Sequence, residues 1–180
     1  MLLETKRLSL RKFAATDFDD YCHYVMNDDE LAYMMKTEPI HTFEDARFCF
    51  DWKLNRETEI WYAVCLKDEK KTVVGGITIH PVPQEFILQR PELQNKSGVS
   101  LSFSISRHYR RRGLMEEAVR ALIDYLFHEE TMDFINCGYM DYNHASCQMQ
   151  EKLGFTYLLT DRFKEDGKEF VAIENILWRS

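Results

Sequence analysis

Residues 99–106 carry the most regular pattern in this chain, a strict alternation of apolar residues and serines. A period of two predicts a β-strand with one buried face. Residues 114–127 follow with apolar side chains at helical spacing, which predicts an amphipathic helix. Only residues 107–113 separate the two patterns. A strand that runs through a short turn into a helix is typical of layered proteins that combine strands and helices.

The rest of the chain also combines segments whose apolar residues have the spacing of a strand with segments that have the spacing of a helix. Period-two or apolar runs predict strands at 7–11, 60–66, 72–79, 134–140, 155–160 and 170–177. Helical spacing predicts helices from Asp17 to about residue 27, from the capping sequence at Thr42 to Leu54, with Phe43, Ala46 and Phe50 on the same stripe, and at 145–153. Residues 81–97 hold three of the four prolines and predict a long excursion between strands. We expect an α/β or α+β fold in a single domain, residues 1–180.

Composition excludes several functional classes. The chain has 180 residues, 45% of them hydrophobic and 29% charged, as in ordinary globular proteins. Its formal net charge of −7 argues against nucleic acid as the main partner, because phosphate backbones are bound by basic surfaces. An acidic surface suits cationic substrates such as amines, but acidity also serves solubility, and both interpretations stay open.

Targeting and redox signals point to the cytoplasm. The charged start of the chain lacks the apolar core of a signal peptide, and no window approaches the length of a membrane span. The five cysteines are widely spaced and form no Cys-x-x-Cys pair. We therefore expect neither a disulfide framework nor a metal site, and a location in the reducing cytoplasm without membrane attachment.

The turn between the two clearest elements is the segment that carries chemistry. Helix starts leave backbone N–H groups without partners and carry partial positive charge. Gly113 lets an anion approach the backbone, and the three arginines before it add donors. These features suit a diphosphate site, although the segment lacks the patterns of a P-loop or a dinucleotide fingerprint. The alternative is a basic turn that only solvates the surface, and contact with RNA is disfavoured by the net charge.

Three segments resemble one family. The sequence Arg110-Arg111-Arg112-Gly113-Leu114-Met115 resembles the Arg-x-x-Gly-x-Gly/Ala coenzyme motif of GNAT-superfamily N-acetyltransferases, with Met115 departing from the small residue. Asn143–Ser146 followed by Glu151–Phe155 resembles a second signature of that family. The opening residues 5–11 resemble the start of its RimJ/RimL-like subgroup.

The resemblance implies a mixed, strongly bent sheet with two splayed central strands, flanked by helices. It also implies acetyl-CoA as cosubstrate and no metal. The amides of residues 111–115 would hold the diphosphate, the backbone of strand 99–106 would bond the pantetheine arm, and Asn143 and Ser146 would lie near the pantetheine and the sulfur. The coenzyme-binding residues implied are Ser104, Ile105, Arg110, Arg111, Arg112, Gly113, Leu114, Met115, Asn143 and Ser146. Asn143 and Ser146 also suit helix capping, which is compatible with this role.

Amide formation needs a neutral amine. Deprotonating a lysine-like amine at pH 7 costs roughly 4–5 kcal/mol, whereas a peptide α-amine costs about 1.4 kcal/mol. Many relatives carry a glutamate base where this chain has Ser100, and a tyrosine where it has Gln150. A water chain that ends on Glu38 or Asp141 is the expected substitute for the base, and Ser146 is a weak acid for the sulfur.

The histidines near this region are better read as structural. His80, His108 and His144 are expected to be hydrogen-bonded in the fold rather than catalytic.

These observations predict an N-acetyltransferase that moves an acetyl group directly to a primary amine. The acceptor is a protein N-terminus or a small amine such as a polyamine or an aminoglycoside, and the protein is a monomer or a homodimer. The alternative function is a CoA-binding sensor or pseudoenzyme, which would keep the diphosphate site but lack a base.

Overall fold

The computed structural model of the chain describes residues 2–180 and contains an eight-stranded sheet in the order β1-β2-β3-β4-β5-β6-β8-β7. The strands are β1 (Leu2–Glu4), β2 (Leu8–Lys12), β3 (Ile60–Leu66), β4 (Val73–Pro81), β5 (Gly98–Ile105), β6 (Phe134–Met140), β7 (Thr156–Glu165) and β8 (Lys168–Trp178). The α-helices are α1 (Phe18–Val25), α2 (Asp29–Met35), α3 (Phe43–Leu54), α4 (Gln84–Gln89), α5 (Leu114–His128) and α6 (His144–Leu153). Short 3-10 turns are η1 (Ala15–Asp17), η2 (Pro91–Leu93) and η3 (Arg107–Tyr109). The predicted mixed sheet with flanking helices is confirmed.

The chain forms two compact units, each assembled from two segments. The first unit comprises the residues up to Ile79 together with Phe103–Leu122. The second comprises His80–Ser102 and Ile123–Ser180. The single domain expected for residues 1–180 stays a prediction.

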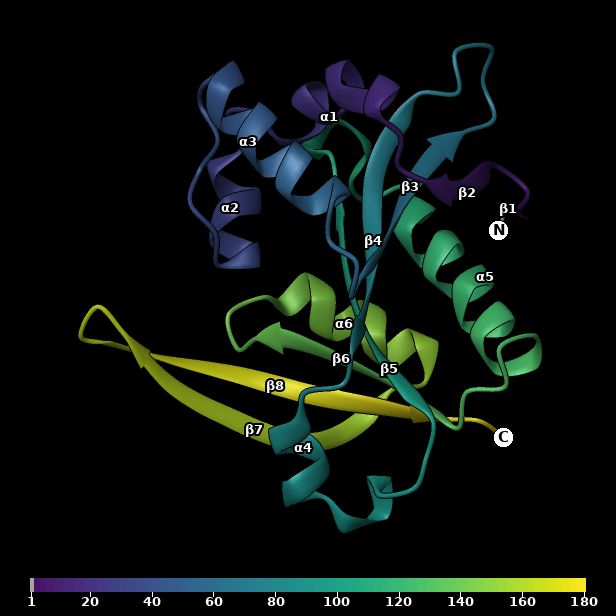
Figure 1. Cartoon of the computed structure of the whole chain (residues 1–180), viewed down its shortest axis with the longest axis vertical. Helices are drawn as coiled ribbons and strands as arrows, with labels where there is room; N and C mark the ends of the chain where they lie inside the picture. Colours follow the sequence, from purple (N-terminus) through teal and green to yellow (C-terminus); the bar gives the residue numbers. More distant parts are fainter. Residues whose placement is uncertain (1) are drawn as a thin grey trace. The chain divides into compact units, whose positions relative to one another are not determined.

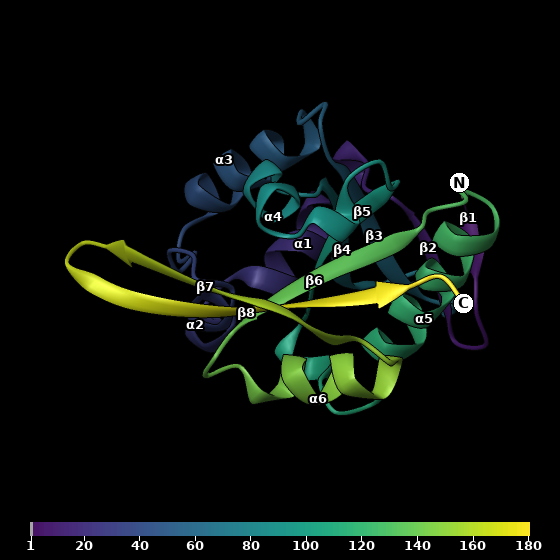
Figure 2. The same ribbon diagram turned by 90° about the horizontal axis from the view of Figure 1, so that it is seen from below.

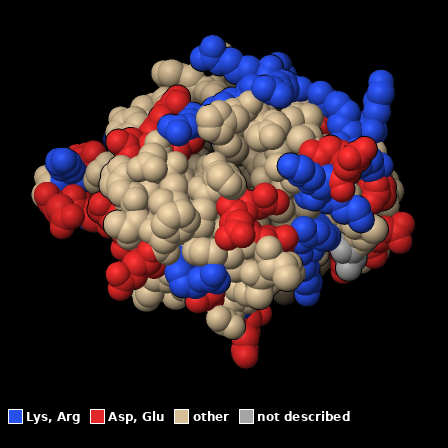
Figure 3. All heavy atoms as spheres, turned by 90° about the horizontal axis from the view of Figure 1, so that it is seen from above, with Lys and Arg blue, Asp and Glu red and all other residues tan. Residues whose placement is uncertain are grey.

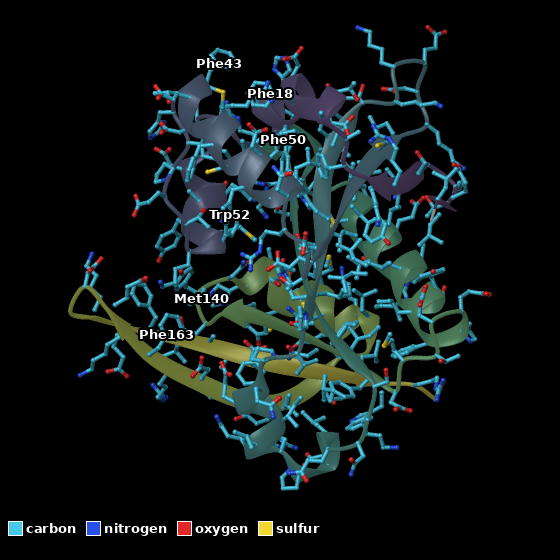
Figure 4. The ribbon with its side chains drawn as sticks, in the orientation of Figure 1. Phe18, Phe43, Phe50, Trp52, Met140 and Phe163 are labelled. Atoms are coloured by element: carbon cyan, nitrogen blue, oxygen red, sulfur yellow. The ribbon has the colours of Figure 1, made fainter. Side chains whose placement is uncertain are left out.

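In the first unit, β1 to β4 pair in antiparallel fashion. Figure 1 shows α1 and α3 on one side of β3 and β4, and α5 on the other. An aromatic cluster fills the space between α1, α3 and β3, where Phe13 stacks on Trp61 with ring centroids 3.7 Å apart. Phe18 and Phe50 meet edge to face at 5.6 Å in the same cluster (Figure 4). Burial of large aromatic rings anchors these helices on the sheet.

Helix α3 begins where the capping sequence predicts. The Thr42 hydroxyl oxygen accepts a hydrogen bond from the Asp45 N–H at 3.1 Å. Ala46 and Phe50 are fully buried on the expected stripe. Phe43, however, is 67% exposed, because it is the first residue of the helix and lies at its end, away from the aromatic cluster (Figure 4).

Two helices are absent from the sequence prediction. Helix α2 begins at an Asp28 cap and ends at Lys36, which adopts a left-handed φ of 51°. Helix α4 lies within the excursion 81–97, and its Phe86 packs with Leu93 against the second unit's sheet. The excursion is therefore a packed insertion and not an open loop.

The second unit holds a parallel pair of strands, β5 and β6. The register of β5 and β6 joins Gly98–Leu101 to Phe134–Cys137 and ends there, although both strands continue. Pairing that stops before either strand ends is expected where two neighbouring strands diverge. β6 pairs with β8, and β8 with β7, in antiparallel fashion. Figure 2 shows α6 on one side of β6 and β8.

Candidate functional site

The turn between β5 and α5 has an unusual backbone. The Ser106 N–H donates to the Val74 carbonyl at 2.8 Å, which anchors the end of β5 on β4. After η3, Arg111 and Gly113 adopt left-handed φ values of 60° and 67°. Gly113 suits such a conformation because it has no Cβ, whereas Arg111 adopts it at a steric cost. The turn thus delivers the chain directly into the first residue of α5, Leu114.

The side chain of Arg7 binds the backbone of this turn on its carbonyl side. Its guanidinium donates to the carbonyl oxygens of Arg112 at 2.9 Å and Gly113 at 3.1 Å. In a trans peptide the C=O and the following N–H point in opposite directions. The N–H groups of Gly113 and Leu114 therefore point away from Arg7. Together with the positive end of α5, they form a site suited to an anion.

Glu117 fixes Arg7 in this position. Its carboxylate accepts from the Arg7 Nε at 2.6 Å, from the Arg7 N–H at 2.9 Å and from the Thr5 hydroxyl at 2.6 Å. Burial raises the pKa of Glu117, but the hydrogen bonds from Thr5 and Arg7 outweigh this effect and hold the pKa below its usual value. The opening sequence therefore has a physical role, since Thr5 and Arg7 orient the turn.

The predicted arginines do not share one role. Arg110 is tied to two carboxylates, Asp28 at 2.6 Å and Glu30 at 2.5 Å, so its charge is already paired. Arg111 and Arg112 are exposed, and the Arg112 guanidinium lies 5.2 Å from the centroid of the Tyr109 ring. These two side chains are the ones placed to add charge near an anion.

The large residue at the end of the motif does not obstruct the turn. Met115 is only 6% exposed. Its terminal carbon lies 3.1 Å from the position that a Cβ on Gly75 would take, so the side chain packs against β4. Methionine in place of the small residue of the family motif therefore fills space in the core, and its side chain does not occupy the exposed side of the turn.

At the end of β5, Ser104 and Ile105 precede the turn. The Ser104 hydroxyl is hydrogen-bonded to the hydroxyl of Tyr24 from α1. Burial raises the pKa of Tyr24 to about 12, so this phenol stays protonated at neutral pH. Tyr24 fixes the Ser104 side chain, and the strand backbone is the part left for the expected contact with pantetheine.

In the second unit, Asn143 caps α6. Its side-chain oxygen accepts from the Ser146 N–H at 3.1 Å, as a capping residue should. The Ser146 hydroxyl accepts from Gln150 Nε2 at 3.1 Å, and the Gln150 oxygen accepts from Asn175 at 3.0 Å. Gln150 is fully buried. The structure therefore brings Asn143 and Ser146 together, and Gln150 orients the serine.

A second series of linked side-chain hydrogen bonds in this unit was not predicted from the sequence. The Ser100 hydroxyl donates to Asn136 Oδ1 at 2.8 Å, and Asn136 Nδ2 donates to Glu174 Oε2 at 2.9 Å. Burial raises the pKa of Glu174 to about 6. The only signal in the sequence is that an asparagine and a glutamate interrupt apolar strands.

The other expected candidates are a hydrogen-bonded histidine and several exposed side chains. His80 Nε2 is 2.7 Å from the Ser102 hydroxyl oxygen, which agrees with a hydrogen-bonded histidine. Glu38 lies exposed on the loop between α2 and α3, Asp141 is exposed after β6, and His108 and His144 are exposed as well.

Neither a membrane span nor a metal centre emerges from residues 2–180. No helix there is long and apolar enough to cross a bilayer. No group of three or more His, Cys, Asp or Glu side chains in that range could hold a metal ion. In the space-filling view of Figure 3, basic and acidic side chains lie interspersed over the visible face.

A comparison with models of protein families identifies the family of this chain. The sequence model of a family described as "Acetyltransferase (GNAT) domain" matches residues 7–156. The chain belongs to the GNAT acetyltransferase family. The match includes both the turn before α5 and the Asn143–Ser146 cap. The predictions of a GNAT acetyltransferase and of an enzyme are confirmed, and acetyl-CoA is the acetyl donor that this family uses.

Relatives agree with this assignment. The chain is 24% identical over 160 residues to a protein from Bacillus subtilis (strain 168) named "Probable N-acetyltransferase YjcK", covering 86% of this chain and 83% of that protein.

Three solved structures share the GNAT fold of this chain at low sequence identity. A GNAT acetyltransferase from Bacillus anthracis is 20% identical with a TM-score of 0.79, covering 99% of both chains. A spermidine N-acetyltransferase from Vibrio cholerae, solved with CoA and spermine, is 16% identical with a TM-score of 0.73, covering 97% of both. A ribosomal-protein-S5-alanine acetyltransferase from Vibrio fischeri is 17% identical with a TM-score of 0.72, covering 99% of this chain and 97% of that one.

Proposed function

We propose that this GNAT protein transfers the acetyl group of acetyl-CoA directly to a primary amine. The observation that carries the proposal is the contact of Arg7 with the carbonyl oxygens of Arg112 and Gly113. This contact turns two backbone donors outward at the positive end of a helix, which is the chemistry that a diphosphate requires. The exposed side chains of Arg111 and Arg112 add charge at the same place.

The residues present fit the coenzyme. The amides of Arg111 to Met115 would hold the diphosphate, and the backbone of Ser104 and Ile105 would bond the pantetheine arm. In the second unit, Asn143 would bond the pantetheine side and Ser146 would lie near the sulfur. Arg110 contributes through its backbone and through its ion pairs, because its guanidinium is already bound by carboxylates.

Acetyl-CoA supplies a thioester whose acyl carbon accepts the amine nitrogen. Ser146 is proposed as a weak proton donor to the departing sulfur, and Gln150 holds its hydroxyl in a defined direction. Glu38 and Asp141, the two bases expected from the sequence, are both exposed and would act only through a water bridge.

We propose a primary amine on a protein N-terminus or on a small amine, a polyamine or an aminoglycoside, as the acceptor. The similar structures include one enzyme named for spermidine and one named for a ribosomal-protein alanine, with nearly equal TM-scores of 0.73 and 0.72. The opening Thr5–Arg11 pattern supports membership of the RimJ/RimL-like subgroup. The five free cysteines support the cytoplasmic location. A monomer or homodimer is the expected assembly.

Two measurements test the proposal. Calorimetry with acetyl-CoA should show binding at tens of micromolar or below, and no heat would overturn it. A free-thiol release assay over N-terminal peptides, spermidine and an aminoglycoside should identify an acceptor. Coenzyme binding without thiol release from any amine would favour the CoA-binding sensor instead.

A further inference from the structure

Acetylation of an amine needs a group that removes a proton from the ammonium form. Such a base is most effective when its pKa lies near the working pH. It must also be held in place without a cation, since a paired cation would make the carboxylate a weaker base.

Glu174 on β8 meets the geometric requirement. Its carboxylate accepts from Asn136 Nδ2 at 2.9 Å, and the other end of that amide accepts from the Ser100 hydroxyl at 2.8 Å. Asn136 is fully buried, and its Nδ2 also donates to the Asn175 carbonyl at 3.0 Å. All polar atoms of the Asn136 side chain are therefore engaged, and the amide holds Glu174 and Ser100 in a fixed relation.

The strand registers place these groups on one face. Ser100 pairs with Asn136 across β5 and β6, and Gly138 pairs with Glu174 across β6 and β8. Residues two apart on a strand point to the same side, so Ser102 follows Ser100 on this face. Gly138 leaves room for the carboxylate, because a Cβ there would lie 2.2 Å from Glu174 Oε1.

The surroundings of Glu174 favour a proton acceptor. The side chain is half-buried and so keeps access to solvent. Burial, and to a smaller extent the nearby charge of Asp161 on β7, raise its pKa to about 6 against the opposing effect of the Asn136 hydrogen bond. The thiol of Cys137 on β6 also interacts with Glu174. A carboxylate with these neighbours is ionised at neutral pH and basic enough to take a proton.

We propose that Glu174, in place of Glu38 or Asp141, is the general base of the acetyl transfer, positioned by Asn136; this inference rests on the proposed function. The carboxylate takes a proton from the ammonium group, which leaves a lone pair on nitrogen. That pair forms the C–N bond while the C–S bond breaks and its electrons leave with sulfur. The acylated nitrogen then gives up its second proton to the thiolate, through water or the Ser146 hydroxyl, so that coenzyme A leaves as the thiol. Glu174 returns the first proton to water, and the net products are the amide, the thiol and one proton. The balance needs no further reactant.

The main test replaces Glu174 with glutamine. With the best amine of the peptide, spermidine and aminoglycoside panel, we expect kcat/KM of Glu174→Gln to fall about 100-fold or more. Acetyl-CoA affinity by calorimetry should not change. The loss of rate that the unsubstituted enzyme shows as pH falls through about 6 should disappear. Glu169→Gln is the matched control, since Glu169 lies exposed on the same strand, and it should keep the full rate.

A second readout does not depend on turnover. Because folding raises the pKa of the Glu174 carboxyl, the free energy of unfolding of the protein falls as pH rises between about 4.5 and 6. The free energy of unfolding of Glu174→Gln should therefore rise relative to the unsubstituted protein over that range. Gly138→Ala tests position alone, because its methyl group must displace the flexible carboxylate, and we expect a slower enzyme that still folds.

The outcomes separate the two proposals. If the unsubstituted protein binds acetyl-CoA and releases thiol while Glu174→Gln keeps its rate and pH profile, the inference is overturned and the proposed function stands. The same holds if His80→Gln abolishes the rate and Glu174→Gln does not. Failure of the unsubstituted protein to bind acetyl-CoA would overturn the proposed function and the role of Glu174 with it.

Discussion

The guanidinium of Arg110 lies 2.6 Å from the carboxylate of Asp28, a side chain that is only 4% exposed. Asp28 also accepts a hydrogen bond from the Leu31 N–H at 3.0 Å and so caps α2. The arginine that begins the coenzyme motif thus fastens a neighbouring helix to the turn. A second arginine does the same, since Arg107 donates to the Asn27 carbonyl at 2.7 Å.

Arg110→Ala should therefore destabilise the protein. Removing one partner of a buried ion pair leaves the other charge unpaired, at a cost of about 3–5 kcal/mol. Urea unfolding at pH 7 measures this change. Asp28→Asn in the same chain should recover part of the loss, because asparagine also caps helices and carries no charge. A normal unfolding free energy combined with weakened acetyl-CoA binding would show instead that the Arg110 side chain holds phosphate.

Arg7→Ala should weaken acetyl-CoA binding. The substitution removes the donors that hold the carbonyl oxygens of Arg112 and Gly113, so the two outward N–H groups lose their fixed direction. Loss of one charge-assisted hydrogen bond corresponds to about tenfold or more in affinity. Calorimetry provides the measurement, and Lys6→Ala, an exposed neighbour of like charge, is the control. Equal affinities of both variants would contradict the role assigned to Arg7.

Sequence patterns predicted the long elements because their periods are clear. The alternation at 99–106 and the apolar stripe of α5 each extend over two or more turns or pleats, and burial of one face fixes them. Helices α2 and α4 have only 7 and 6 residues, too few to show a stripe. For α2 the signal in the sequence was local, an acidic cap at Asp28, and the left-handed φ of Lys36 that ends the helix is seen only in the structure.

The candidate site could be proposed from the sequence only where its residues are contiguous. The turn from Arg110 to Met115 carries its own pattern, whereas the Ser100–Asn136–Glu174 contacts join three strands. Which residues face each other across strands depends on register, and alternation within one strand does not give it. The contact of Arg7 with the turn, more than 100 residues away, could not be found for the same reason.

Gly113→Ala and Gly113→Glu should separate backbone strain from charge. A Cβ at this position has room, since the nearest atom, on Arg7, is 3.7 Å away. The φ of 67° still costs an L-residue about 1–2 kcal/mol, so both variants should lose similar stability. Only the glutamate places a negative charge beside the diphosphate and should abolish detectable binding. Thermal unfolding and calorimetry report the two effects, and unchanged affinity of a folded Gly113→Glu protein would remove Gly113 from the site.

Acid should weaken the fold through Asp17. This carboxylate is 7% exposed, binds Arg11 at 2.6 Å and 2.7 Å, and accepts the Ala14 N–H at 2.8 Å. Burial raises the pKa of Asp17, but the hydrogen bonds from Arg11 and Ala14 outweigh it and leave the pKa below its usual value. Because folding lowers this pKa, the stabilisation is present above about pH 3.9 and is lost as pH falls through the folded-state value. Asp17→Asn should therefore lower the free energy of unfolding at pH 7, and its difference from the unsubstituted protein should shrink toward pH 3 in urea titrations. The exposed Asp19→Asn serves as control, and a deficit of Asp17→Asn that stayed constant from pH 7 to pH 3 would refute the linkage.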